Sequence, residues 1–229
     1  MNETAKLEEI LGYHFRDEKL LRTALTHPSC GHELRQKLPD NQRLEFLGDA
    51  VLQLVLTRQL YRQLPNFDEG NLTSLRAAIV NRKTLESIAN QFQLGQFLIL
   101  GRGEILNHGR SKSSNLADAM EAIIGAIFVD GDFESSAAWL EPVLQSWIDE
   151  HKDKVELFNP KGALQECLQA MGKTTPEYVV ESEEGPDHAK HYRVIVMSEG
   201  AELGRGSGSS KKTAEIEAAA TALKKLKTS

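Results

Sequence analysis

The chain of 229 residues carries 27 Lys and Arg against 33 Asp and Glu, and 40% of its residues are hydrophobic. This length suffices for one large or two small domains, and a charged fraction of 26% indicates a soluble protein with a core. No apolar run approaches the roughly 20 residues of a membrane span, and the first residues do not resemble a secretory signal. We therefore expect a cytoplasmic protein with no membrane partner, whose cysteines, Cys30 and Cys167, are unpaired thiols.

The first two thirds of the chain, residues 3–151, show helical spacing of apolar residues almost throughout. The longest helix is predicted over Asn41–Leu64, directly before a proline that ends it. Glycines and basic residues over Gly101–Lys112 predict a flexible surface loop, because they follow neither helical nor strand periodicity. Ser113 or Ser114 is expected to cap the helix that follows this loop.

The pattern changes at Pro160, which can open a helix as its first residue. Three segments with strand character and an alanine-rich helix follow, at residues 177–183, 191–196, 201–206 and 211–226. This order predicts a small α+β module (α-β-β-β-α) over residues 160–228, joined to the helical part by a charged linker, residues 152–159. From Pro160 onward ten Lys and Arg balance ten Asp and Glu, so the net charge of −6 lies in the helical part. Clustered lysines in the module favour a polyanionic partner.

Two of the predicted helices are apolar on nearly every side, yet each carries a pair of acids. Glu45 and Asp49 are four residues apart, and Asp118 and Glu121 are three apart, so each pair projects from one helix face. Burial of carboxylates is costly unless something compensates their charge. If the two helices pack together, four carboxylates converge, and a hard divalent cation such as Mg²⁺ or Mn²⁺ would neutralise them.

Such a cation can activate water and hydrolyse phosphate esters. The alternative is that these acids are helix-start residues or lie on partly exposed faces. Glu45 and Asp118 fit that alternative, because each lies in a first helical turn, where the helix dipole favours a carboxylate. Asp49 and Glu121 lie deeper in their helices and are harder to explain in this way.

The segment Arg43–Ala50, RLEFLGDA, resembles the signature of the ribonuclease III family. Residues 68–70 and 116–122 match the places where that family has its other acids. The last 70 residues resemble a double-stranded-RNA-binding domain, through GPDH at residues 185–188 and GSGSSKK at residues 206–212. The resemblance covers essentially the whole chain in order, and the two-domain layout is similar to the bacterial form of the enzyme.

The resemblance implies an all-α endonuclease domain, residues 3–151, followed by a small α+β RNA-binding domain, residues 160–228. Such an endonuclease acts as a homodimer on double-stranded RNA and leaves 5′-phosphates, 3′-hydroxyls and short 3′ overhangs. Its cofactor would be Mg²⁺, with Mn²⁺ as a substitute. Its role would be the processing of ribosomal-RNA precursors and some messenger RNAs.

The resemblance also assigns roles to single residues in the helical part. All four acids match metal-binding positions, and Asp49 and Glu121 match the positions regarded as catalytic. Glu69 matches a supporting acid. Phe46 matches an aromatic that inserts into the partner subunit, although ordinary core packing would explain a phenylalanine there equally well. Gln42 stands where many members have Glu, which removes an ionised group at that position.

Duplex RNA is bound through its minor groove and phosphates, because its major groove is too deep and narrow for side chains to enter. Lys211 and Lys212 lie in the first turn of the last predicted helix, where a helix N-terminus also favours a phosphate. We expect these two lysines to contact phosphates. The resemblance implies a minor-groove contact for His188 and contacts with ribose hydroxyls for Gln165 and Glu166.

Two other functions are compatible with parts of the sequence. A non-catalytic protein that binds duplex RNA would keep the fold, but such a protein is expected to lose acids from the quartet, and all four are present. A metal-dependent phosphohydrolase of small molecules would use helical acids, but it leaves the C-terminal module without a purpose.

Overall fold

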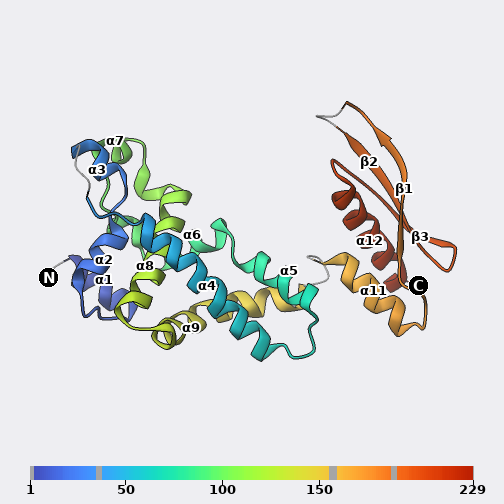
Figure 1. Ribbon diagram of the computed structural model, residues 1–229, viewed down its shortest axis with the longest axis horizontal. Coiled ribbons are helices and arrows are strands. Elements are labelled where there is room, and N and C mark those ends of the chain that lie inside the picture. The colour runs from blue at the N-terminus through green and yellow to red at the C-terminus, as the bar shows by residue number, and fades with distance from the viewer. Residues whose placement is uncertain (1–2, 35–37, 155–158, 187–189, 229) are drawn as a thin grey trace. The chain divides into compact units, whose positions relative to one another are not determined.

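The computed structural model describes four stretches of the chain, residues 3–34, 38–154, 159–186 and 190–228. They form two compact units (Figure 1). The first unit contains the residues up to Asn66 together with Arg76–Glu150, and the second contains Phe67–Leu75 and the residues from His151 onward. The predicted domain limits stay a prediction, because residues 155–158 of the expected linker lie outside the described residues. No helix in the described stretches is long and apolar enough to cross a membrane.

Helices build the first unit, as the sequence predicts. Their bounds are α1 Glu3–Leu11, α2 Glu18–Leu25, α3 Ser29–Leu34, α4 Gln42–Gln63, α6 Arg82–Gln91, α7 Arg102–Leu106, α8 Ser113–Asp130 and α9 Phe133–His151. Helix α5, Glu69–Ile79, has residues in both units. The short 3₁₀ turns are η1 Leu94–Gln96, η2 Gly109–Ser111 and η3 Lys152–Lys154. The long helix predicted over Asn41–Leu64 is thereby confirmed, with one residue less at each end.

Helix α8 lies at the centre of the first unit, where it packs against α4, α6 and α2. From Leu116 to Ile127 every residue is buried except Asp118 and Glu121. A helix that is apolar on nearly all sides is expected in such an interior position. The two acids are the interruptions of this buried segment, so they mark where α8 meets a polar part of the molecule.

Helix α4 buries one face and exposes a stripe of apolar side chains on the other. Leu44, Leu52 and Leu56 are among the buried residues. Phe46, Leu54 and Tyr61 are 82%, 56% and 74% exposed, respectively. We call these three residues the outer stripe of α4, because their spacing places them on one side of the helix.

The segment Gly101–Lys112 differs from the flexible loop that the sequence predicts, because it folds into α7 and η2. The reason is a buried amide. Asn115 Nδ2 donates to Glu104 Oε1 at 2.9 Å and to the carbonyl oxygen of Gly109 at 3.0 Å, which fixes the segment to the start of α8. The expected capping by Ser113 or Ser114 is wrong, since Lys112 precedes the first helical residue and makes no side-chain cap.

The second unit has the predicted α-β-β-β-α order. Its elements are α11 Pro160–Ala170, β1 Glu177–Glu184, β2 His191–Ser198, β3 Ala201–Gly208 and α12 Lys211–Thr228. The three strands form one antiparallel sheet in the order β1-β2-β3, and α12 packs on β2, β3 and α11. Both helices cover the same face of the sheet (Figure 1). The core between them consists mainly of Leu164, Leu168, Val194, Val196 and the alanines of α12.

Candidate functional site

The four predicted acids lie on two helices that pack against each other. Glu45 and Asp49 belong to α4, and Asp118 and Glu121 belong to α8. Contacts between α4 and α8 are the most extensive of any pair of elements, and Figure 1 shows the two helices side by side. The two pairs therefore meet at one helix junction, which we call the acid site.

Two glycines allow the backbones of α4 and α8 to come this close. A Cβ atom on Gly48 would collide with the carbonyl oxygen of Glu121, and a Cβ atom on Gly125 would collide with the carbonyl oxygen of Leu44. Neither glycine is among the residues predicted from the sequence. A signal for them exists, because glycine inside a helix costs about 1 kcal/mol relative to alanine and indicates a packing requirement.

Glu121 has the most strongly perturbed carboxyl group of the acid site. Burial, followed by the negative charges of Asp49, Glu45 and Asp118, raises the pKa of Glu121 from 4.5 to about 7. Like charges disfavour ionisation in this way only when they are near one another. The two pairs therefore lie near enough to disfavour each other's ionisation, as expected if their helices pack together.

Glu45 and Asp118 are perturbed in the same direction. Burial, then the charges of Asp118 and Asp40, raise the pKa of Glu45. Burial also raises the pKa of Asp118, and the positive charge of Arg82 opposes that rise. Arg82 is the first residue of α6 and is exposed. It was not predicted, because an isolated arginine at a helix start carries no distinguishing signal in one sequence.

The donor atoms of the acid site fit a hard divalent cation. All four side chains offer carboxylate oxygens, which suit Mg²⁺ and Mn²⁺ better than zinc. The raised pKa of Glu121 also indicates negative charge that the protein itself leaves uncompensated. Among the described residues, no three His, Cys, Asp or Glu side chains lie close enough as they stand to hold one ion. Mutual repulsion between the carboxylates favours such spacing, and Glu45, Asp49, Asp118 and Glu121 are the residues that would hold the ion.

Asp49 is held by a neighbour on its own helix. Nε2 of Gln53, one turn further along α4, donates to Oδ1 of Asp49 at 2.9 Å and to Oδ2 at 3.1 Å. The contact is solvent-exposed. One amide thus fixes both oxygens of the Asp49 carboxylate.

Glu69 is the first residue of α5 and is exposed. Its Oε1 accepts a hydrogen bond from Oγ1 of Thr73 at 3.1 Å. Glu69 belongs to the second unit, whereas the four acids belong to the first. The supporting role predicted for it beside the acids stays a prediction.

Phe46 has no place in the core. It is 82% exposed at the start of the outer stripe of α4, which excludes ordinary core packing as its role.

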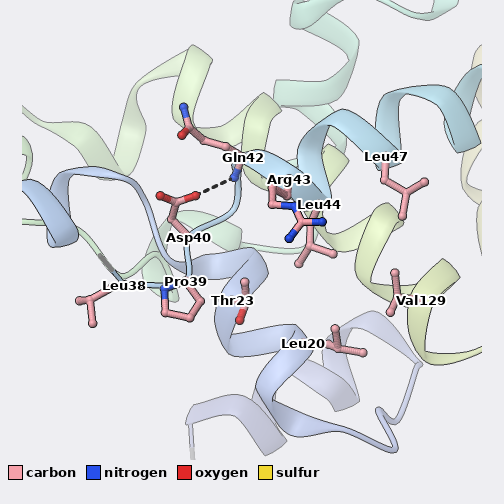
Figure 2. Close-up of a pocket in the computed structure, with 10 residues that line it drawn as sticks. All are labelled: Leu20, Thr23, Leu38, Pro39, Asp40, Gln42, Arg43, Leu44, Leu47 and Val129. Carbon is pink, nitrogen blue, oxygen red and sulfur yellow. Dashed lines mark hydrogen bonds between the residues drawn. The ribbon is translucent and has the colours of Figure 1, made fainter. Parts of the chain in front are cut away.

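The first unit also has a pocket of about 730 Å³ (Figure 2). Apolar side chains of α2, α4 and α8 line much of it, and they are Leu20, Leu44, Leu47 and Val129. Gln42 and Asp40 also line this pocket, and the backbone N–H of Gln42 donates to Asp40 Oδ1 at 3.2 Å.

The predicted RNA contacts of the second unit are placed by its two helices. Gln165 and Glu166 are exposed on α11, and Lys211 and Lys212 are exposed in the first turn of α12. His188 lies outside the described residues. The structure thus leaves Gln165, Lys211 and Lys212 accessible to a partner. Glu166 is exposed as well, but its Oε1 accepts a hydrogen bond from Nδ2 of Asn71 at 2.8 Å.

The start of α12 has the features of a phosphate-binding helix end. The N–H of Thr213 donates to Oγ of Ser210 at 3.2 Å, which caps the helix. Nζ of Lys211 lies 5.8 Å from the centroid of the Tyr192 ring. Lysines at a helix N-terminus oppose the helix dipole, so this position is more suited to an anionic ligand than to stabilising the helix.

Two family models match the chain. One, described as Ribonuclease-III-like, matches residues 17–146 and contains the acid site. The other, described as the double-stranded RNA binding motif, matches residues 160–226. Together they cover both units.

Similar proteins match over nearly the full length. Ribonuclease 3 of Desulfotalea psychrophila is 45% identical over 97% of this chain and 92% of its own. Ribonuclease 3 of Chloroflexus aggregans is 46% identical over 96% of each chain. The crystal structure of the nuclease domain of ribonuclease III from Campylobacter jejuni matches with a TM-score of 0.58 and 43% identity, covering 64% of this chain and 96% of that one. A second structure of that domain, described as showing flexibility in a region involved in dimer formation, matches with the same TM-score.

Proposed function

Because this chain belongs to the ribonuclease III family, and so is a double-strand-specific endoribonuclease, we propose that its acid site performs metal-assisted hydrolysis of RNA phosphodiesters. The products would be 5′-phosphate and 3′-hydroxyl ends with short 3′ overhangs. One observation carries this proposal. Glu121 is half-buried beside the other three acids, and its pKa rises to about 7. A site with this much uncompensated charge is suited to a cation.

Members of the family depend on divalent metals, and we propose Mg²⁺ as the ion, with Mn²⁺ as a substitute. Glu45, Asp118 and Glu121 would hold the ion, together with Asp49. When bound, the cation supplies an activated water and stabilises the charge that develops on the scissile phosphate. The protein's own contribution is to fix the carboxylates on two helices that pack closely against each other.

Asp49 and Glu121 are proposed as the catalytic pair. Glu121 sits among the three other acids, and a carboxylate held at such a place is suited to act as a general base. Asp49 is the more accessible partner, and its carboxylate faces the amide of Gln53. A proton released from the attacking water can therefore pass to a carboxylate that lies within the site.

We propose that the chain forms a homodimer, a proposal supported by the outer stripe of α4 and by the pocket in Figure 2. An exposed Phe, Leu and Tyr on one helix face is an apolar patch of the kind that marks a protein interface. We propose that Phe46 of one protomer enters the apolar pocket of a second copy, which would give a two-fold interface with the stripe of each protomer facing its partner. The dimer-forming region described for the nuclease domain from Campylobacter jejuni supports this proposal.

Double-stranded RNA is the partner of the second unit. We propose that Lys211 and Lys212 contact phosphates, with Gln165 and Glu166 at ribose hydroxyls. We further propose that the natural substrates are ribosomal-RNA precursors and some messenger RNAs. The cytoplasm is the proposed compartment.

The proposal is tested by incubating the full chain with a long RNA duplex, with Mg²⁺, Mn²⁺ or EDTA. We expect cleavage with either cation and none with EDTA. The fragment ends are identified by enzymatic labelling before and after phosphatase treatment. We expect the 5′ ends of the fragments to accept a label only after phosphatase treatment, because a 5′-phosphate blocks labelling. Duplex binding without cleavage under every condition would favour a non-catalytic RNA-binding protein instead.

A further inference from the structure

Gln53 is the first polar residue after Asp49 along α4, and the side chains of these two residues are hydrogen-bonded. Residues four apart on a helix face each other, so this contact is built into the sequence of α4. Its Nε2 reaches Oδ1 of Asp49 at 2.9 Å and Oδ2 at 3.1 Å. Within the described part of the chain, the other three acids of the site accept no comparable side-chain hydrogen bond. Asp49 is thus the one acid of the quartet that the protein orients directly.

The contact leaves Asp49 able to bind a cation. Two carboxylate oxygens offer about four lone-pair directions, and one amide group occupies only part of them. The remaining directions stay open to a metal ion or a water. A partner that holds a carboxylate in this way removes the rotational freedom that a cation would otherwise have to restrict.

The residue type at position 53 fits this role. Glutamine supplies a neutral N–H donor on a side chain long enough to reach back one helical turn. A carboxylate at the same place would repel Asp49 across four residues, and an aliphatic side chain would leave it without a donor. Gln53 is exposed, so solvent would accept many polar residues at position 53, and it is the two hydrogen bonds to Asp49 that distinguish glutamine there.

We propose that Gln53 is the positioning residue of the acid site, whose amide orients the Asp49 carboxylate for the divalent cation and thereby sets the affinity for that cation. This inference rests on the proposed function. Gln53 does not touch the reacting atoms; it acts through Asp49. Loss of an orienting partner of a metal-binding carboxylate typically lowers metal affinity about 10- to 100-fold.

The test uses Gln53→Met, which keeps the length of the side chain and removes the donor. Its matched control is Gln63→Met on the same helix. Gln63 is also exposed, but its Nε2 bonds Oε1 of Gln145 at 2.8 Å and reaches no acid of the site. Mn²⁺ alone is titrated into the full chain without RNA, and the unbound ion is followed by electron paramagnetic resonance.

We expect the dissociation constant for Mn²⁺ to rise about 10- to 100-fold in Gln53→Met and to stay at the wild-type value in Gln63→Met. In cleavage assays, Gln53→Met should need more Mg²⁺ for half of its maximal rate, and saturating Mg²⁺ should restore the rate of the wild type. Asp49→Asn should not be rescued at any Mg²⁺ concentration. This pattern separates a positioning residue from a catalytic one.

Wild-type affinity for Mn²⁺ in Gln53→Met, in a protein that binds the ion and cleaves RNA, would overturn this inference and leave the proposed function intact. Tighter binding in the variant would also overturn it, because it would show that the amide competes with the cation. If the wild-type chain neither binds Mn²⁺ nor cleaves duplex RNA, the proposed function fails, and this inference fails with it.

Discussion

The substitution Glu121→Gln should stabilise the protein at alkaline pH when divalent cations are removed. In the acid site, burial and then the charges of Asp49, Glu45 and Asp118 raise the pKa of Glu121 from 4.5 to about 7. The ionised carboxylate is therefore unfavourable in the folded protein without a cation. Glutamine keeps the shape of the side chain and removes its charge, so it relieves that cost.

The pH dependence follows from the two pKa values of Glu121, 4.5 when unfolded and about 7 when folded. The folded state holds this proton more tightly, so its contribution to stability is complete below pH 4.5 and is lost as the pH rises to about 7. Each unit of pKa shift corresponds to about 1.4 kcal/mol, or roughly 3.4 kcal/mol for the full shift. Solvent screening of a group that is only partly buried reduces this to about 1–2 kcal/mol.

The assay is urea unfolding of the full chain in EDTA at a series of pH values from 4 to 8.5. Tryptophan fluorescence reports the first unit, because both tryptophans, Trp139 and Trp147, lie on α9. The stability of Glu121→Gln relative to the wild type should increase by about 1–2 kcal/mol across this range, and added Mg²⁺ should reverse the difference by stabilising the wild type. Glu9→Gln, a substitution of an exposed residue of α1, serves as control. A variant that shows no relative gain at high pH would mean that the ionised Glu121 carboxylate does not destabilise the folded protein.

Three further substitutions test other parts of the account. Gly48→Ala places a methyl group against the α8 backbone, so we expect a loss of about 1–3 kcal/mol in unfolding free energy and a loss of cleavage. Phe46→Asp puts a charge at the tip of the outer stripe, so sedimentation should show monomers where the wild type forms dimers. Replacing Lys211 and Lys212 together by alanine should weaken duplex binding and reduce the slope of log affinity against log salt by about 1–2.

Each of these substitutions has a matched control in the chain. Gly103→Ala adds a methyl group where nothing lies within 4 Å, and it should leave stability unchanged. Leu106→Asp changes an equally exposed apolar residue, 80% exposed, outside the stripe of α4. Lys173→Ala removes a lysine next to Thr174, which contacts Ser198 at the end of β2, whereas Lys211 lies by Tyr192 at the beginning of that strand. Equal effects of control and test substitution would contradict the role given to the tested residue in each case.

The acid site could be predicted from the sequence because its signal is local. Asp49 and Glu121 are acids in helices that are otherwise apolar, and the spacing within each pair fixes the helix face. The distance between the helices could not be predicted in this way, since it depends on Gly48 and Gly125, which meet the opposite backbone. Contacts between segments far apart in the chain leave no periodic pattern in either segment.

Exposure was harder to predict than secondary structure. A phenylalanine at position 46 fits the core of one subunit or the interface between two, and only the structure shows that its side chain points outward. The segment Gly101–Lys112 was predicted as a loop because short helices lack periodicity. Its order comes from Asn115, which lies beyond the segment and bonds back to it.

Most of the RNA-binding module was predictable, because β1 and β2 carry β-branched residues and the last helix is rich in alanine, and both have strong local preferences. Strand β3, AELGRGSG, has no β-branched residue and was predicted from its place between β2 and that helix. The order of elements and the position of Pro160 at the first helix are confirmed. The specific RNA contacts stay predictions, since shape recognition of a duplex depends on where side chains lie on the surface.

The most direct measurement of the central claim compares cleavage and binding of one long RNA duplex by the wild type and by Glu121→Gln at saturating Mg²⁺. If the acid site performs the chemistry, the variant should lose cleavage by at least about 100-fold while its duplex affinity, measured by filter binding in EDTA, remains that of the wild type. Cleavage at the wild-type rate by the variant would contradict the assignment of the acid site.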